Sequence, residues 1–269
     1  MTNHEIARRR DTEGEADVRF WEGRETLRLD PELGAPATGP VGSLFRDSGS
    51  KGKWHHYFFV YDRHIGPHAG RDLRLLEIGL GHGGSVTTWQ RFLGDGAEII
   101  GVDTRESCKD YERENIAVRI GSQADRGFLR SLVEEFGSFD IIIDDGGHKV
   151  NQQRRSFEVL YPALTTDPGI YLVEDLHSNY WPRFVDERPT FIEVMAELVH
   201  DLHTPYETIT SAMQAVTTIE DGEQYVGGVP RDSLPPLEVS PFAATTRGIH
   251  FYDSMIVVEK ATRHRPTCG

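Results

Sequence analysis

The stretch Leu75–Ser85, LLEIGLGHGGS, decides the fold. Its apolar residues form a short run that is typical of a buried parallel strand and that ends in glycine. Four glycines within the six positions 79–84 then form a loop that allows positive φ angles and a close approach of the backbone to a ligand. Helical spacing of apolar residues follows at once, over residues 85–94. The stretch therefore predicts a strand, a ligand-binding turn and a helix.

The same alternation of strand and helix continues along the chain. Residues 125–137, 152–164 and 188–203 have helical spacing, and Asp125 and Gly137 are suitable caps for the first of these helices. Further strands are predicted at EIIGVD (98–103), VRIGS (118–122), FDIIIDD (139–145) and GIYLVED (169–175), with an edge strand or hairpin at 249–260. This order predicts an α/β fold, with a doubly wound, mostly parallel sheet and helices on both faces.

The N-terminal part of the chain has a different character. Residues 31–43, PELGAPATGPVGS, are rich in turn formers. We expect residues 1–45 to form an N-terminal arm or lid, loosely attached and with one helix around 16–27. Residues 46–269 are expected to form the main domain.

Composition excludes several classes of protein. The formal net charge of −14 argues against a basic face that binds nucleic acid and against docking on an anionic membrane. Cys108 and Cys268 lie far apart and form neither a disulfide framework nor a CxxC metal motif. Nothing approaches the roughly 20 apolar residues of a membrane span, and the N-terminus lacks the apolar core of a signal peptide. We expect a soluble, cytoplasmic protein.

The glycine loop and two acids indicate the class of cofactor. Gly79, Gly81 and Gly84 satisfy the GxGxxG spacing, which dinucleotide-binding proteins share. Glu77, two residues before the loop, would repel a pyrophosphate but can accept from a cationic or hydroxylated ligand. Asp103, at the end of the second strand, can accept both ribose hydroxyls. S-adenosylmethionine has a ribose, an ammonium and a sulfonium but no phosphate, so it is favoured over NAD, which stays the alternative.

Two further residues are candidates for contact with the methyl donor. Gln123 follows the third strand and can hydrogen-bond the adenine edge, although it can also be a surface glutamine before a helix. Asp144 ends the fourth strand. It either caps the following turn through backbone amides or contacts the donor.

Acids follow the fourth and fifth strands and indicate a metal. Asp145 comes after the fourth strand, and Glu174 and Asp175 after the fifth. One helix joins these strands, so the carboxyl ends of both should meet at one edge of the sheet. Carboxylates gathered there would repel each other and raise their pKa values unless a cation is present. Hard oxygen ligands suit Mg²⁺, and we expect these three residues to bind it.

His148, three residues beyond Asp145, is the candidate general base. A neutral imidazole can accept a proton from a hydroxyl that a metal has acidified. The alternative is a satisfied polar histidine. His177 is a weaker candidate for the same role, or it orients a neighbour.

Taken together, the motifs KWHHY, LLEIGLGHGGS, GVD, GSQAD, DIIIDDGGH, YLVEDLHSNYW and IHFYDSMIVVEK resemble the metal-dependent sugar O-methyltransferases of natural-product tailoring. The resemblance runs from about Phe45 to Trp181 and returns at the C-terminus. It implies a Rossmann-like class I methyltransferase fold. It also implies Mg²⁺ at Asp145, Glu174 and Asp175, His148 as base, and Glu77, Gly79, Asp103 and Gln123 at the donor. Gly147 departs from the expected serine, which predicts a loosened turn.

The expected reaction is Mg²⁺-dependent methylation of a sugar hydroxyl on a glycosylated small molecule in antibiotic biosynthesis, by a homo-oligomer. The alternative is a noncatalytic S-adenosylmethionine-binding partner protein, or one associated with a hydroxylase, because cephalosporin-hydroxylase-type proteins share much of the pattern. The aromatic stretch 53–61 is either core packing or an acceptor wall and subunit contact.

Overall fold

The computed structural model describes residues 39–48, 53–204, 219–220, 223–224 and 238–264. The chain divides into the units 1–34 and 35–269, and all the described residues belong to the second. The helix expected around 16–27 and most of the expected arm lie outside the described residues. Among the described helices, none combines the length and the apolar character that a membrane crossing needs.

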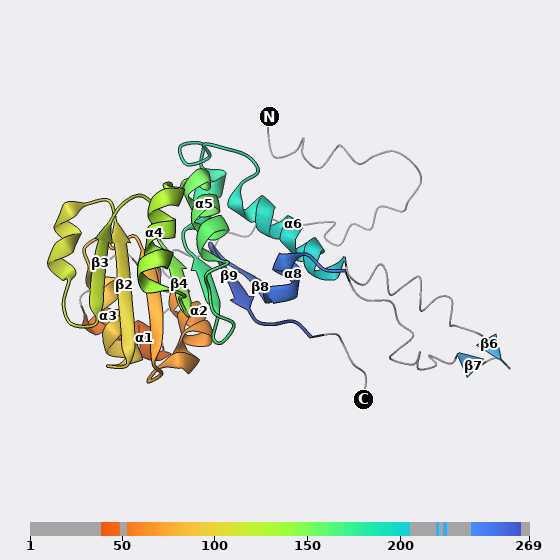
Figure 1. The fold of residues 1–269 in the computed structure, drawn as a ribbon, viewed down its shortest axis with the longest axis horizontal. Coiled ribbons are helices and arrows are strands. Elements are labelled where there is room, and N and C mark those ends of the chain that lie inside the picture. The colour runs from red at the N-terminus through yellow and green to blue at the C-terminus, as the bar shows by residue number, and fades with distance from the viewer. Residues whose placement is uncertain (1–38, 49–52, 205–218, 221–222, 225–237, 265–269) are drawn as a thin grey trace, which may run out of the picture. The chain divides into compact units, whose positions relative to one another are not determined.

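A seven-stranded sheet forms the centre of the fold, in the order β3-β2-β1-β4-β5-β9-β8 (Figure 1). The first five strands of this order are parallel, and β9 and β8 add to β5 in antiparallel fashion. The strands are β1 (Leu73–Ile78), β2 (Ala97–Asp103), β3 (Ile116–Ile120), β4 (Ile141–Asp144), β5 (Ile170–Val173), β8 (Thr246–Tyr252) and β9 (Met255–Lys260). The predicted mostly parallel sheet and its C-terminal hairpin are confirmed.

Helices cover both faces of this sheet (Figure 1). One face packs against α1 (Gly39–Asp47), α2 (Tyr57–His64) and α3 (Gly84–Leu93), and the other against α4 (Arg126–Phe136), α5 (Val150–Leu160) and α6 (Phe191–His203). Shorter elements are the 3₁₀ turns η2 (Gly66–His68), η3 (Glu106–Tyr111) and η4 (Leu176–Tyr180), the short helix α8 (Pro241–Thr245), and the strand pair β6 (Ile219–Glu220) and β7 (Glu223–Gln224).

Local sequence signals explain where these helices begin and end. The Asp125 carboxylate accepts hydrogen bonds from the amides of Gly127 and Phe128, so it caps α4 as predicted. Thr190 and Glu193 form a capping box at the start of α6. Gly137 ends α4 with a φ of 77°, a conformation that favours glycine.

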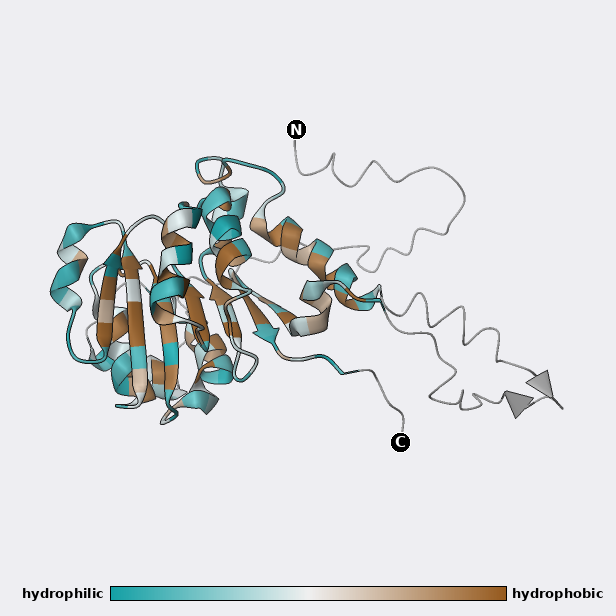
Figure 2. Ribbon diagram, in the orientation of Figure 1, coloured by the Kyte–Doolittle hydropathy of each residue, from teal (hydrophilic) through white to brown (hydrophobic). Residues whose placement is uncertain are grey.

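Side chains alternate between the two faces of the sheet along each strand, so the hydrophobic core has two parts, one on each face. Leu75 and Ile141 pack on the α1–α3 face, whereas their neighbours Leu76 and Ile142 pack on the α4–α6 face. The strands are accordingly apolar on both sides, as buried parallel strands are, while the helices turn hydrophilic faces outward (Figure 2). Val41 and Phe45 of α1 belong to the first core, so this helix spans the predicted boundary at residues 45 and 46.

The chain leaves β1 toward one face and β4 toward the other, although these strands are neighbours. Such a topological switch point opens a crevice beyond the carboxyl ends of the strands. Gly79, with a φ of 91°, follows β1 at this point. A Cβ atom on Gly79 would lie 2.0 Å from the carbonyl oxygen of Asp145. The two loops therefore touch through backbone alone.

We predict that Gly79→Ala lowers the free energy of unfolding by about 2–5 kcal/mol, because left-handed backbone strain and overpacking add. Gly70→Ala is the matched control, since Gly70 has a φ of 78° and open space where its Cβ would lie. The control should lose only about 1–2 kcal/mol. Urea unfolding measures both values, and equal losses would contradict the close backbone approach.

Candidate functional site

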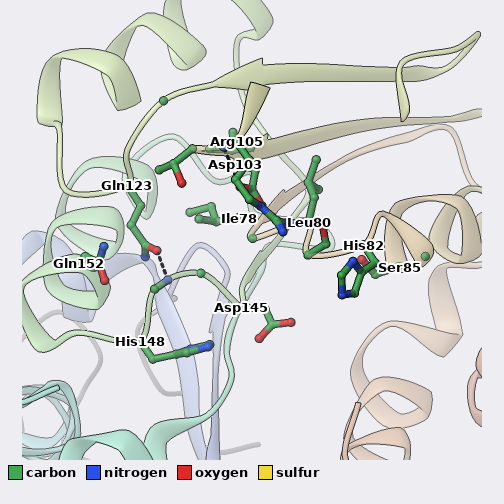
Figure 3. Close-up of a pocket in the computed structure, with 18 of the residues that line it drawn as sticks. Ile78, Leu80, His82, Ser85, Asp103, Arg105, Gln123, Asp145, His148 and Gln152 are labelled. Atoms are coloured by element: carbon green, nitrogen blue, oxygen red, sulfur yellow. Dashed lines mark hydrogen bonds and ion pairs between the residues drawn. The ribbon is translucent and has the colours of Figure 1, made fainter. Parts of the chain in front are cut away.

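A cavity of about 710 Å³ lies at the switch point, between the loops that follow β1 and β4. Figure 3 shows Asp103 and Arg105 on one side of it and Asp145 and His148 on the other. Its volume is in the range of small-molecule sites. Six of the predicted site residues line it, namely Gly79, Gly81, Asp103, Gln123, Asp145 and His148. Glu77, Asp144, Glu174 and Asp175 are not part of its wall.

Asp103 is held in its charged form at the end of β2. Burial raises its pKa, but hydrogen bonds from the Arg105 side chain and backbone and from the Leu80 amide lower it to about 2. The Leu80 amide lies 3.0 Å from Asp103 Oδ2. The half-exposed Arg105 guanidinium bonds both oxygens of Asp103 and also the carbonyl of Gly81. Arg105, which the sequence did not single out, thus connects the two loops at the cavity mouth.

Gln123 joins the loop after β3 to the loop after β4. Its amide nitrogen donates to Asp144 Oδ1 at 2.9 Å, and its amide oxygen accepts from the Gly147 amide at 2.7 Å. Asp144 is buried and also bonds Ser156 and the amide of Gly146. The contact with a backbone amide matches the capping alternative for Asp144. The hydrogen bond from the Gly147 amide to Gln123 holds the turn at Gly147 in place.

Glu77 lies beneath the cavity, fully buried. Neither of its carboxylate oxygens makes a hydrogen bond to a described residue, and the ammonium of Lys53 lies 4.0 Å from Oε1. Burial raises the pKa of Glu77 to about 7, against the opposing effect of Lys53. Burial of a carboxylate is costly, and the Lys53 ammonium is the positive charge that partly offsets this cost for Glu77.

Lys53 provides the positive charge that this region requires. Its ammonium lies 2.7 Å from Asp145 Oδ2 and 2.8 Å from each carboxylate oxygen of Glu174. Burial lowers the pKa of Lys53, but Asp145 and Glu174 raise it by more, so it lies well above the ordinary value. Burial and Asp145 raise the pKa of Glu174. The carboxylates therefore form a cation cradle, and in this structure the cation is an ammonium.

Two tyrosines of α2 complete the cradle. Tyr61 donates to Glu174 Oε1 at 2.6 Å, and Tyr57 donates to Asp175 Oδ1 at 2.7 Å. Burial raises the pKa of both phenols, so both remain donors. The aromatic stretch is thus core packing for Tyr57, Phe58 and Tyr61, while Trp54 and Phe59 are exposed.

His148 and Asp175 face each other across the cavity edge. His148 Nε2 lies 3.5 Å from Asp175 Oδ2, and one ligand atom from each of Asp145, His148 and Asp175 lies within 4.8 Å of the others. Both His148 and Asp175 have positive φ angles, 59° and 55°. Such backbone strain in non-glycine residues concentrates at functional sites.

The structure therefore brings the predicted metal ligands and the predicted base together, but in two groups. In one group Asp145 and Glu174 surround Lys53, and the other consists of Asp145, His148 and Asp175. Asp145 belongs to both, since it shares Lys53 with Glu174 and lies beside His148 and Asp175. His177 is not in either group, because its Nδ1 pairs with the Ser254 hydroxyl at 2.6 Å.

An aromatic rim runs beside His148, formed by Trp54, His177, Trp181 and Phe184. Ring centroids are 6.3 Å apart for Trp54 and His177, 4.5 Å for His177 and Trp181, and 6.4 Å for Phe184 and His148. Trp54 and Trp181 are about half exposed. The rim offers ring faces to a molecule that reaches His148 from solvent.

Sequence reasoning missed Lys53, Arg105, Tyr57 and Tyr61. A signal for Lys53 was available, because the argument that clustered carboxylates need a cation applies to an ammonium as well as to a metal. The tyrosines lie 113 and 118 positions before their acid partners, so no local pattern indicates those contacts.

No family model matches the chain. It is 31% identical over 259 residues to the 8-demethyl-8-(2-methoxy-alpha-L-rhamnosyl)-tetracenomycin-C 3'-O-methyltransferase of Streptomyces olivaceus, covering 90% of this chain and 60% of that protein. It is 36% identical over 137 residues to the mycinamicin VI 2''-O-methyltransferase of Micromonospora griseorubida, covering 48% of this chain and 34% of that protein. The chain thus spans 60% or less of the length of these relatives.

Among solved structures, the chain is similar to the MycE methyltransferase of mycinamycin biosynthesis in complex with Mg, SAH and mycinamycin VI. The TM-score is 0.65 at 25% identity, and the match covers 82% of this chain and 53% of that one. The predicted class I methyltransferase fold is confirmed, as is the resemblance to sugar O-methyltransferases of antibiotic pathways.

The raised pKa of the buried Glu77 carboxyl predicts how the stability of the protein changes with pH. Its folded pKa of about 7 lies above the ordinary value of 4.5, so the folded protein binds its proton more tightly than the unfolded chain. The resulting stability is present below pH 4.5 and is lost as the pH rises through 7. Relative to the wild type, Glu77→Gln should gain up to about 3 kcal/mol of unfolding free energy between these pH values.

Denaturant unfolding at several pH values measures this difference. Glu134→Gln is the control, because Glu134 is an exposed residue of α4. A Glu77→Gln profile parallel to that of the wild type would show that Glu77 titrates normally.

Proposed function

We propose that the chain is an S-adenosylmethionine- and Mg²⁺-dependent O-methyltransferase that acts on a sugar hydroxyl of a glycosylated natural product. The observation that carries the proposal is the cavity at the switch point, with a ribose-type acid, Asp103, at one side and the Asp145, His148 and Asp175 group at the other. Two relatives named above are O-methyltransferases, and the similar MycE methyltransferase was solved in complex with Mg and SAH, which supports the proposal further.

The methyl donor would bind along the glycine loop. Asp103 is ionised at neutral pH and can accept two ribose hydroxyls once Arg105 turns away from it, while the Leu80 amide keeps the carboxylate in place. Gly79 and Gly81 leave room for the donor beside the backbone, and Gln123 lines the cavity where an adenine edge can reach it. We assign Glu77 to the negative field that favours a cationic donor.

Asp145, Glu174 and Asp175 would hold Mg²⁺. Asp145 and Glu174 fit a cation, because their carboxylate oxygens converge on the Lys53 ammonium at 2.7–2.8 Å, and Asp175 offers a further oxygen beside Asp145. The ion, when bound, supplies acidification of the sugar hydroxyl. Lys53 must then withdraw from between Asp145 and Glu174, because two cations in one cradle repel each other.

His148 would take the proton of the hydroxyl at Nε2, the nitrogen that faces Asp175. The bound donor would supply the methyl group, so that the new O–C bond would form as the donor's S–C bond breaks and S-adenosylhomocysteine would leave. Asp175 stabilises the imidazolium that results. Orientation and acidification supply most of the rate, since the donor is already reactive.

The aromatic rim would bind the acceptor. The rings of Trp54 and Trp181 suit the apolar faces of sugars and aglycones, and Phe184 connects Trp181 to His148. We propose that the protein acts in the cytoplasm as a homo-oligomer, to which the exposed Phe59 can contribute a contact. Light scattering measures the subunit number.

Incubation with labelled S-adenosylmethionine and a panel of rhamnosyl and deoxysugar glycosides tests the reaction. We expect label in the acceptor, loss of transfer after chelation with EDTA, and recovery with Mg²⁺. Full turnover after thorough chelation would remove the metal from the mechanism. If calorimetry shows tight donor binding but no glycoside accepts the methyl group, the noncatalytic partner protein would be favoured. The His148–Asp175 pair argues against that alternative. Binding of NAD without S-adenosylmethionine would favour a nicotinamide enzyme.

Replacement of His148 and replacement of Asp145 should affect different steps of the reaction. His148→Ala should keep donor and Mg²⁺ binding while slowing the chemical step about 10²–10⁴-fold, the usual contribution of a positioned base. Asp145→Ala should weaken Mg²⁺ and acceptor binding together with turnover. The two losses should not multiply in the double variant, because an unacidified hydroxyl gains little from a base.

Metal titrations and single-turnover rates for the four proteins measure these effects. His200→Ala, on the exposed side of α6, is the histidine control. Near-normal chemistry in His148→Ala would end the assignment of His148 as base and make His177 the next candidate.

A further inference from the structure

A second group of metal-type ligands lies at the other end of α2, away from the cavity. His64 is the last residue of α2, His250 is in β8 and Glu259 is in β9. In the β8–β9 register Gly248 pairs with Glu259 and His250 with Val257, so the side chains of His250 and Glu259 project from the same face of the hairpin. Val257 packs in the core on the α1–α3 side, so this face is the one that α2 covers.

The three side chains converge at distances typical of a metal site. His64 Nδ1 lies 3.1 Å and His250 Nε2 lies 3.4 Å from Glu259 Oε1. One ligand atom from each residue lies within 4.8 Å of the others. Ligand atoms at about 2.0–2.1 Å from a tetrahedral zinc ion are about 3.3–3.4 Å apart, as geometry requires. The measured separations from the carboxylate oxygen match this spacing.

The bonding state of each residue suits a ligand. His250 Nε2 is buried and makes no hydrogen bond to a described residue. His64 Nε2 lies 2.8 Å from the Tyr252 hydroxyl, which leaves Nδ1 directed at the carboxylate. A ligating histidine whose other nitrogen is held by a partner is the usual arrangement of metal sites.

We propose that His64, His250 and Glu259 bind a Zn²⁺-type transition-metal ion, with water in the fourth position. Two imidazoles and one carboxylate are ligands that Zn²⁺ accepts. His250 and Glu259 are partly exposed, at 32% and 22% of their side-chain surface, so an ion can enter from solvent. The proposal does not depend on the methyltransferase reaction.

The ion would fix the C-terminal end of α2 to the β8–β9 hairpin. The helix has 8 residues, which is about 12 Å at 1.5 Å per residue. Its opposite end carries Tyr57, which binds Asp175, and Tyr61 between the two ends binds Glu174. An ion at His64 would therefore hold in place the helix that supports the carboxylate cradle. Without an ion, the same residues form a metal-free network, in which His64 Nδ1 hydrogen-bonds Glu259 and His250 Nε2 lies 3.4 Å from the same carboxylate oxygen, and the experiment below separates the two states.

Titration of Co²⁺ into the chelator-stripped full chain tests the site, because the visible absorption of Co²⁺ reports tetrahedral coordination. The background is Asp145→Asn, which disables the carboxylate cradle as a competing site. We expect a single equivalent of Co²⁺ that Zn²⁺ displaces. Tyr252→Phe should weaken binding about 10–100-fold, as the loss of an orienting partner does. His250→Gln should weaken it by at least as much, since it removes a ligand.

His200→Gln is the matched control and should bind Co²⁺ as the background protein does. Zn²⁺ should also raise the melting temperature of the control but not that of His250→Gln. Absence of tetrahedral Co²⁺ in the background protein would mean that the network is metal-free, and the proposal would be wrong. Co²⁺ binding that survives unchanged in His250→Gln would locate the ion elsewhere and would overturn the proposal equally.

Discussion

The candidate site depends on one backbone contact, between Gly79 and the carbonyl of Asp145. No side chain fits between them, since a Cβ on Gly79 would lie 2.0 Å from that oxygen. This contact sets the distance between the loop that would bind the donor and the loop that carries Asp145 and His148. Because β1 and β4 are neighbours at a switch point, every other group at the cavity is positioned relative to this pair of loops.

Much of the fold could be predicted because its signals are local. Runs such as IIID at β4 and the cap at Asp125 identify elements without knowledge of their neighbours. The rule that parallel strands end at one edge then predicts that Glu174, which follows β5, approaches Asp145 and His148 in the loop after β4. Asp103 ends β2 and Gln123 follows β3, so the same rule brings both residues to this edge of the sheet, where they line the cavity.

The rest could not be predicted because it depends on long-range packing of α2. Tyr57, Tyr61 and Lys53 contact acids that are more than 90 positions away. His64 meets Glu259 across 195 positions. The aromatic stretch left core packing and an acceptor wall open, and it did not predict the direction of each hydroxyl, which depends on the angle of the helix on the sheet. The boundary at residue 45 was drawn from turn formers, yet Val41 and Phe45 are buried in the core.

The Lys53 ammonium has a consequence for how the acids of the site are kept together. Acids at the ends of β1, β4 and β5 would repel one another in a newly made chain, and many metal sites are formed only when their ion arrives. Here a cation that is covalently part of the chain lies between Asp145 and Glu174 at 2.7–2.8 Å and offsets part of their charge. The chain can therefore hold these acids close together without a bound metal ion.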